Sequence, residues 1–324
     1  MRARLRQTLL TCLSSTAILL LLVLVGSCRR VQPAHYPEVI LFSIQGTTPF
    51  SDYIWAVQPD GSDPKPLLSP TRFRSYASAA ANDLSKNMVV SVHQSETGEI
   101  VEDHLFLYWH EEDKWRRLIT EDLIEGIAAV AHDDMRVAFV AAPKERAGDY
   151  RIWLTDTSSS KVQKISSDEE GTWDGYPSWH PNGQEVAFLR FRRTPEGLVT
   201  RLMISHLDNG SATEFLSSDN SVLSFCYAPD GKRIALWTKD GLEILTVSDK
   251  SRRVLLPIQQ LSPSYRLRAS NLSWSRTEDK IAYALLNIDT KSAEMWTILS
   301  DGSDAKKIYS TQRGIIQHLS FVER

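Results

Sequence analysis

An eleven-residue segment that joins two apolar strands through a polar turn recurs along this chain. It reads YAPDGKRIALW at Tyr227–Trp237, WHPNGQEVAFL at Trp179–Leu189 and, more loosely, WSRTEDKIAYA at Trp274–Ala284. The copies start at residues 179, 227 and 274, so their offsets are 48 and 47 residues. A repeat of this period carried by short strands predicts a propeller or another repeat array, which constrains the fold more than any other feature.

A second pair of strands follows each copy and completes the repeat. IWAVQPDGSDPKPLL at Ile54–Leu68 returns as MWTILSDGSDAKKIY at Met295–Tyr309. Laid end to end, the halves give six units at about 38–68, 75–119, 124–166, 175–217, 222–257 and 269–310. They predict an all-β, six-bladed β-propeller over residues 38–324.

The two ends of the predicted propeller complement each other. The first unit lacks its opening strand, and GIIQHLSFVER at Gly314–Arg324 is a strand without a unit. We therefore predict that the C-terminal strand pairs with the N-terminal blade and closes the ring. Closure of this kind removes the exposed sheet edges that invite aggregation.

The connections between strands divide into a tight set and a long set. Asn182-Gly183 and Asp230-Gly231 predict two-residue hairpin turns with positive φ angles after the first strand of a blade. These tight turns lie on one face of the propeller, the tight-turn side. The loops after the second and fourth strands lie on the opposite face, the long-loop side, and are longer: Gln45–Asp52, His93–Asp103, Ala142–Asp149, Ser167–Gly175, Phe191–Thr200 and Ile258–Arg268. Because binding residues concentrate on loops carried by a rigid scaffold, we predict a binding surface on this long-loop face, around the mouth of the central channel.

The first 27 residues have the layout of a secretory signal peptide. Arg2, Arg4 and Arg6 precede a mostly apolar stretch over residues 9–25. The stretch ends in Val-Gly-Ser before Cys28, which resembles the bacterial lipobox, whose cysteine becomes lipid-modified. We expect a signal peptide over 1–27, a lipid anchor at Cys28 and a tether over 28–37. The alternatives are an ordinary cysteine beside a conventional cleavage site and an uncleaved anchor over residues 9–25.

Charge and cysteine content argue against a nucleic-acid partner and against a disulfide. The 37 basic residues include three in the signal, so 34 remain against 40 acidic ones and the mature net charge is −6. A scattered negative charge of this size argues against a nucleic-acid partner. Of the three cysteines, Cys12 would leave with the signal and Cys28 would be lipidated, so Cys226 would have no partner and we expect no disulfide.

The repeat tract resembles a known family. The pattern W/Y-x-P-N/D-G-x-x-I/V-A-F/L, followed by an I-W/Y strand and a D-G turn, is similar to the TolB-type propeller of bacterial envelope proteins, and the similarity covers residues 38–324. TolB carries an additional N-terminal α/β domain that binds other Tol components, whereas here a ten-residue tether precedes the blades. The resemblance implies an extracytoplasmic binding module whose partner is an envelope protein, a peptide or a polysaccharide. With the anchor, it places the chain at the cell membrane or outer membrane, in the periplasm or at the cell surface.

Arginine and aromatic residues gather in the long connections and beside the closing strand, and both residue types are favoured at protein-binding hot spots. The alternative for each of them is a solvated rim position or packing between blades. The candidate partner-binding residues are Arg72, Tyr76, Trp173, Asp174, Tyr176, Arg266, Arg268, Arg313 and His318.

Catalytic and metal motifs are absent from the sequence. The eight histidines form no H-x-x-x-H pair, and the two Asp-Gly-Ser-Asp runs have only two carboxylates each, which turn chemistry explains. We therefore predict no metal ligands, no catalytic residues and no cofactor, although an ion held on the axis by several blades stays open.

Three functions remain. The sequence favours a monomeric, lipid-anchored module that binds a partner. The alternative is a propeller enzyme, a lyase, lactonase or glycosidase, acting on a sugar or lactone with groups such as Glu125, Asp174 or His318. A third reading is a structural subunit of an envelope complex. Converging carboxylates or histidines at the axis would favour an enzyme, and an apolar or arginine-rich mouth would favour binding.

Overall fold

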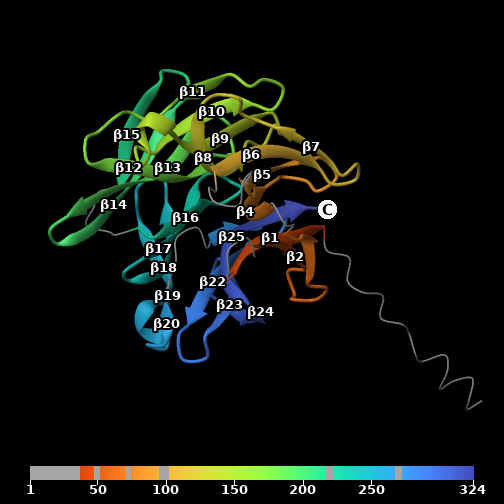
Figure 1. The fold of residues 1–324 in the computed structure, drawn as a ribbon. Coiled ribbons are helices and arrows are strands. Elements are labelled where there is room, and N and C mark those ends of the chain that lie inside the picture. Colours follow the sequence, from red (N-terminus) through yellow and green to blue (C-terminus); the bar gives the residue numbers. More distant parts are fainter. Residues whose placement is uncertain (1–36, 47–51, 71–73, 95–101, 217–221, 267–271) are drawn as a thin grey trace, which may run out of the picture. The chain divides into compact units, whose positions relative to one another are not determined.

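Six antiparallel sheets are arranged around a central channel in the computed structural model of the protein (Figure 1). The structure describes residues 37–46, 52–70, 74–94, 102–216, 222–266 and 272–324. The inner strands of the six sheets contact one another in the cyclic order β25, β4, β8, β12, β16 and β21, and β21 contacts β25 again. The predicted all-β, six-bladed β-propeller is therefore confirmed.

The blades are numbered from the N-terminus, and their strands are given from the inner strand outward. Blade 1 contains β25 (Gly314–Glu323), β1 (Glu38–Gly46), β2 (Tyr53–Val57) and β3 (Lys65–Leu68). Blade 2 contains β4 (Arg74–Ala80), β5 (Asn87–Gln94), β6 (Glu102–Trp109) and β7 (Lys114–Arg117). Blade 3 contains β8 (Leu123–Val130), β9 (Arg136–Pro143), β10 (Arg151–Asp156) and β11 (Val162–Lys164).

The second half of the ring has the same plan. Blade 4 contains β12 (Thr172–Trp179), β13 (Glu185–Thr194), β14 (Gly197–His206) and β15 (Ser211–Leu216). Blade 5 contains β16 (Ser224–Tyr227), β17 (Arg233–Thr238), β18 (Gly241–Thr246) and β19 (Arg252–Pro257). Blade 6 contains β21 (Leu272–Trp274), β22 (Lys280–Asn287), β23 (Ser292–Leu299) and β24 (Lys306–Thr311), and the short β20 (Tyr265–Arg266) also pairs with β22. Two 3₁₀ turns, Lys144–Arg146 and Ile258–Gln260, lie in the connections that the structure describes.

The C-terminal strand closes the ring as predicted. β25 pairs antiparallel with β1 from Glu38 opposite Glu323 to Gly46 opposite Gly314. The buried Glu38 carboxylate fastens this blade to blade 6, where it accepts hydrogen bonds from Ser275 Oγ (2.5 Å), the Arg276 amide (2.8 Å) and Thr277 Oγ1 (2.9 Å). First and last blades are thus joined both by backbone pairing and by a buried carboxylate.

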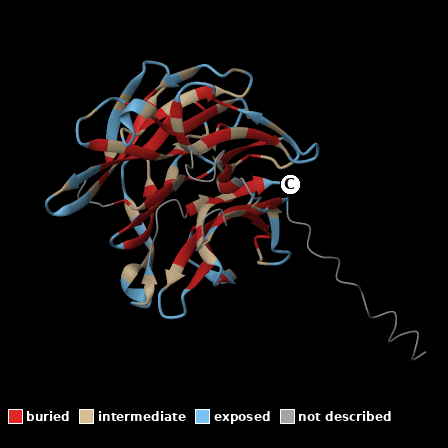
Figure 2. Ribbon diagram, in the orientation of Figure 1, coloured by how far each residue is buried: buried red, intermediate tan, exposed pale blue. Residues whose placement is uncertain are grey.

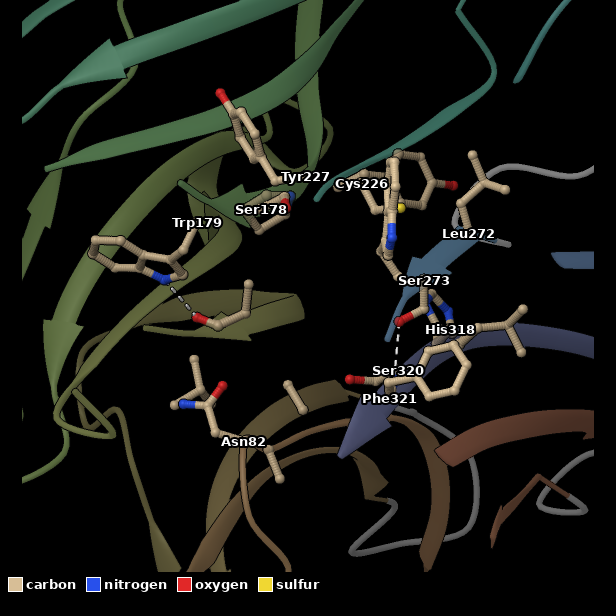
Figure 3. Close-up of a pocket in the computed structure, with 18 of the residues that line it drawn as sticks. Asn82, Ser178, Trp179, Cys226, Tyr227, Leu272, Ser273, His318, Ser320 and Phe321 are labelled. Atoms are coloured by element: carbon tan, nitrogen blue, oxygen red, sulfur yellow. Dashed lines mark hydrogen bonds between the residues drawn. The ribbon is translucent and has the colours of Figure 1, made fainter. Parts of the chain in front are cut away.

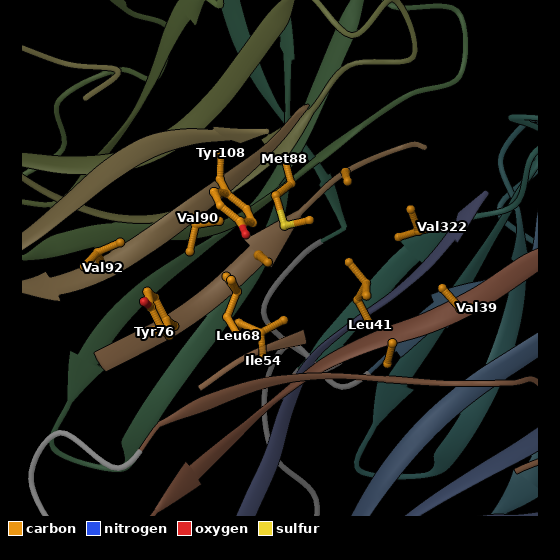
Figure 4. Packing of buried hydrophobic residues seen from close by; sticks show 13 residues of the cluster. Val39, Leu41, Ile54, Leu68, Tyr76, Met88, Val90, Val92, Tyr108 and Val322 are labelled. Atoms are coloured by element: carbon orange, nitrogen blue, oxygen red, sulfur yellow. The ribbon is translucent and has the colours of Figure 1, made fainter. Parts of the chain in front are cut away.

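Hydrophobic clusters fill each of the six boundaries between neighbouring blades. Figure 4 shows the cluster between blades 1 and 2, in which Leu41 and Ile54 of blade 1 meet Met88 and Val90 of blade 2. Buried segments follow the middle of the strands, and exposed ones follow the turns (Figure 2). Because each face of a sheet is covered by the next blade, both alternating sets of side chains are apolar over most of the ring.

The repeated tryptophans join blades together. The Arg136 guanidinium of blade 3 lies 5.0 Å from the ring of Trp179 in blade 4, and Arg233 of blade 5 lies 4.9 Å from the ring of Trp274 in blade 6. Arg136 also donates to the Gly183 carbonyl at 2.7 Å. A Cβ atom at Gly183 would stand 2.8 Å from Arg136 Nη2, so the glycine of the repeat makes room for the neighbouring blade.

Two local predictions were wrong. The repeat turns are not two-residue hairpins: β12 ends at Trp179 and β13 begins at Glu185, and only the glycine of Asn182-Gly183 has a positive φ, +69°. The Gly183 amide donates to the His180 carbonyl, which makes a longer turn. In addition, the predicted loop Phe191–Thr200 is the paired end of the β13–β14 hairpin, with Thr194 opposite Gly197.

The predicted signal peptide and the predicted lipidation site Cys28 lie outside the described residues, as does the predicted tether up to Tyr36. Within the described ranges, the chain has no helix of the length and apolarity needed to cross a membrane.

Candidate functional site

A cavity of about 220 Å³ occupies the central channel, between the inner strands of all six blades (Figure 3). At its long-loop end the cavity is lined by Ile127, Tyr176 and His318. At its tight-turn end it is lined by His132 and Arg276, which come just after inner strands β8 and β21. The labelled residues of Figure 3 come from five blades and surround one space, with Asn82 opposite Ser273 and Cys226.

One small residue from each blade lines the middle of this cavity. In each inner strand it is the residue that pairs with Leu41, Val89, Ala138, Ala187, Ala235 or Ala282 of the second strand. The six lining residues are Ser320, Ala80, Ala129, Ser178, Cys226 and Ser273. Small side chains at this level keep the channel open where six strands converge.

Bulges in two inner strands place larger residues, Tyr176 and His318, at the cavity, and the Tyr176 ring also packs edge-on against Phe191. The register of β12 shifts between Gly175 and Ser178, and that of β25 shifts between Gln317 and Ser320. Tyr176 and His318 occupy these bulges with φ angles of +55° and +54°, an uncommon conformation for residues other than glycine. Their blades, 4 and 1, lie three apart in a ring of six, so the two residues approach the channel from opposite sides. Such strain in a bulge is typical of functional positions.

The cavity contains cationic and neutral polar groups but none of its described lining residues is an aspartate or glutamate. Burial lowers the pKa of His318 to about 4, so its imidazole is neutral at pH 7. Burial also raises the pKa of the Cys226 thiol, which keeps it protonated and unreactive. The channel therefore offers hydroxyls, a neutral imidazole and, on the tight-turn side, one guanidinium.

A polar network surrounds the tight-turn end of the cavity. Asn82 is buried and donates through Nδ2 to the Ala131 carbonyl and to Asp134 Oδ1, both at 2.6 Å. Arg276 of blade 6 donates through Nη2 to Asn82 Oδ1 of blade 2, and its Nη1 lies 4.0 Å from Glu323 Oε1. His132 lines the cavity with Arg276. Although the residue as a whole is exposed, partial desolvation of its ring and then the Arg276 charge lower the pKa of His132.

Asp174 lies in the scaffold rather than at the surface. Its carboxylate is fully buried and accepts two hydrogen bonds from Arg190, from Nε at 2.7 Å and Nη2 at 2.9 Å. Arg190 also donates to the Ser167 carbonyl at 2.7 Å and to Glu169 at 3.2 Å. Burial opposes the charge on Arg190, but the hydrogen bonds and charges of Asp174 and Glu169 raise its pKa overall. This geometry gives Asp174 a structural role in blade 4.

Two further carboxylate groups lie away from the channel. Glu125 is buried in β8 and accepts from the Leu105 amide at 2.6 Å. On the long-loop side, His93 is hydrogen-bonded to Asp103, and its Nε2 lies 3.6 Å from Asp52 of blade 1. The hydrogen bond with Asp103 raises the pKa of His93 against the effect of burial, and the charges of Asp103 and Asp52 add to the increase.

The remaining candidates are dispersed. Tyr76 is buried in the core between blades 1 and 2, with its ring stacked 5.8 Å from Trp115. Trp173 stacks on Phe191 at 5.5 Å and is half-buried. Arg266 and Arg313 are exposed on the long-loop side, and Arg313 covers the ring of Trp55 at 5.6 Å. Arg72 and Arg268 lie outside the described residues.

Thus, of the seven candidate residues that the structure describes, Tyr176 and His318 line the cavity and the other five do not. Sequence reasoning missed Arg276, His132 and the six small residues that line the channel. The signal for the small residues was present in the repeat, because each copy places Ser, Cys or Ala directly before its aromatic or aliphatic residue, as in Ser178-Trp179 and Cys226-Tyr227. No group of three or more His, Cys, Asp or Glu side chains in the described ranges is placed to hold a metal ion.

Comparison with known proteins identifies the fold. No protein-family model and no curated protein matches the sequence. The structure is similar to that of TolB from Acinetobacter baumannii, with a TM-score of 0.67, 17% identity and coverage of 90% of this chain and 68% of that one. A putative TolB from Agrobacterium tumefaciens gives a TM-score of 0.60 at 13% identity, covering 86% and 91% of the two chains. Oligogalacturonate lyase from Vibrio parahaemolyticus gives 0.53 at 14% identity, covering 72% and 68%. At these identities the likeness concerns the fold alone, and the chain is a TolB-like six-bladed β-propeller.

Proposed function

We propose that this protein is a lipid-anchored propeller of the bacterial cell envelope that binds a segment of an envelope partner in its central channel. The observation that carries the proposal is the lining of the cavity. Its described residues are small, aromatic or neutral, with Arg276 and His132 at one end and no carboxylate. A cavity that combines apolar surface with a few polar groups suits binding, whereas general acid–base catalysis requires a positioned proton donor and acceptor.

The lipid anchor at Cys28 and the envelope location rest on the signal-like N-terminus and on the resemblance to TolB-type propellers. The long-loop residues Trp173, Arg266 and Arg313 would extend the contact beyond the channel mouth, where they lie half-buried or exposed. The buried Asp174 and Tyr76 would support this surface without touching the partner.

A channel-filling variant tests the proposal directly. In Ser178→Trp a large side chain replaces one of the six small residues, whereas Ser211→Trp places the same side chain at an exposed position on β15. Partners crosslinked to the intact lipoprotein in solubilised membranes should be lost in Ser178→Trp and retained in Ser211→Trp. Equal capture by both folded variants would contradict channel binding.

The enzyme alternative has its own readout. Because one similar structure is an oligogalacturonate lyase, the wild type can be incubated with oligogalacturonate and unsaturated products followed by absorbance. Turnover that disappears in His318→Gln would favour an enzyme over a binding module.

A further inference from the structure

The tight-turn end of the channel differs from the long-loop end in its charge. Among the described residues that line the cavity, Arg276 is the one permanent cation, and no anionic side chain shares the lining with it. The side chain of Arg276 is 24% exposed. It therefore has solvent access from the cavity as well as contact with the scaffold.

Among the described residues, the guanidinium of Arg276 has a single hydrogen-bond partner. Of its five N–H donors, one bonds to Asn82. Glu323, the carboxylate with which it forms an ion pair, lies at 4.0 Å, beyond hydrogen-bonding distance. By contrast, Arg190 in blade 4 is fully occupied by Asp174, Glu169 and Ser167. Arg276 is thus held in place from one side, and its other donors have no hydrogen-bond partner in the part of the chain that the structure describes.

Two of the neighbouring acids, Asp134 and Asp133, are already paired with other cations. Asp134 accepts from Lys86 Nζ and from Asn82, both at 2.6 Å, and Asp133 accepts from Arg136 Nε at 2.7 Å. His132 lines the cavity together with Arg276, and its pKa is lowered first by partial burial and then by the Arg276 charge. An incoming anion would be attracted by both groups, since a guanidinium binds a carboxylate in a bidentate manner and the imidazole can donate a hydrogen bond.

We propose that Arg276 and His132 form a carboxylate subsite at the tight-turn end of the channel, which takes an acidic side chain or the terminal carboxylate of a peptide segment lying in the cavity. The subsite rests on the proposed function, because it names the chemistry by which the channel recognises its partner. It also places part of the recognition on the face of the repeated turns, opposite to the long loops.

Three blocked or free pentapeptides test the subsite on the full-length protein by isothermal titration calorimetry. The probes are acetyl-ASESA-amide, its uncharged analogue acetyl-ASQSA-amide, and acetyl-ASQSA with a free terminal carboxylate. We expect the uncharged probe to bind about tenfold more weakly than at least one carboxylate probe, the magnitude typical of a hydrogen bond to a charged group. The carboxylate probe that binds more tightly shows whether the subsite takes an acidic side chain or a terminal carboxylate.

The variants localise the effect. Arg276→Met should remove the preference for the carboxylate probe, and Lys232→Met, which deletes an exposed cation of the same face outside the cavity, should leave it intact. His132→Ala, at an exposed position, should weaken the preference and provides a test if Arg276→Met fails to fold. Equal binding of all three probes, no binding of any probe, or a preference that survives in both Arg276→Met and His132→Ala would overturn the subsite. Capture of a membrane partner that is lost in Ser178→Trp but unaffected in Arg276→Met would overturn the subsite alone and leave the channel function standing.

Discussion

Replacing Arg190 by alanine should lower the free energy of unfolding by about 3–5 kcal/mol, the cost typical of removing one member of a buried ion pair. Arg190 is 2% exposed, and its partner Asp174 has no exposed side-chain surface. The substitution removes both hydrogen bonds to Asp174, at 2.7 and 2.9 Å, and the bond to the Ser167 carbonyl at 2.7 Å. It therefore leaves a buried carboxylate without a cation.

The matched control is Lys164→Ala. Lys164 Nζ lies 2.6 Å from Asp168, but the two side chains are 31% and 59% exposed, so solvent screens the pair. Its loss should cost about 0–1 kcal/mol. A further variant, Arg190→Met with Asp174→Leu, removes both charges and should recover most of the stability, because an apolar pair leaves no unpaired ion.

Urea unfolding followed by tryptophan fluorescence measures the four proteins, provided that the m-values agree. The expected order of stability is wild type and Lys164→Ala, then the double variant, then Arg190→Ala. If Arg190→Ala fell within 1 kcal/mol of Lys164→Ala, the assignment of Asp174 to the scaffold would be refuted and its role at the surface would have to be reconsidered.

The other predictions concern the repeat turn, the ring closure and titration. Gly183→Ala should cost more stability than Gly171→Ala in thermal unfolding, since both have positive φ but only the former meets a neighbouring side chain, at 2.8 Å; equal losses would contradict the inter-blade packing. Glu38→Ala should lower the free energy of unfolding by about 3 kcal/mol, because three donors of blade 6 lose a buried charged acceptor, and an unchanged urea midpoint would exclude this clamp. His318, with its pKa lowered to about 4, contributes stability that is fully present above its ordinary value of 6.5 and is lost as the pH falls toward 4. His93, with a raised pKa, contributes stability that is present below 6.5 and is lost as the pH rises through its folded value. Plots of unfolding free energy against pH should therefore lose a rising segment in His318→Gln and a falling segment in His93→Gln. The same change in both variants would refute the opposite directions of the two pKa shifts.

The predicted blades match the observed ones because their signals are local. Alternating apolar residues and Gly-containing turns specify each strand pair within about twenty residues, so the period could be counted directly. The closing strand was also predictable, since Gly314–Arg324 had the pattern of a strand and the first predicted blade lacked its inner strand. The turn type was predicted wrongly because the dipeptide Asn-Gly occurs in longer turns as well, where only the glycine needs a positive φ.

The candidate site was harder to predict for a different reason. Arginine, tyrosine and aspartate have the same appearance in a sequence whether they face solvent or another blade. Asp174 is neutralised by Arg190, sixteen residues away on the next strand, and Tyr76 packs between blades 1 and 2. Arg276 is held at the tight-turn end of the channel by a contact with Asn82, 194 residues earlier in the chain. Burial and pairing of this kind depend on how blades meet, which a repeat pattern does not encode.

The sequence by itself determined the number of blades, their strand content and the closure of the ring, since these follow from periodicity and from pairing between adjacent segments. The tertiary structure decided which side chains are scaffold and which reach the channel. It buried Asp174 and Tyr76, placed Tyr176 and His318 at the cavity through bulges, and left Arg276 as the permanent cation of a lining without described carboxylates. The physical reason is that six inner strands converge on one axis, so the chemistry of the channel is assembled from residues that are distant in the chain.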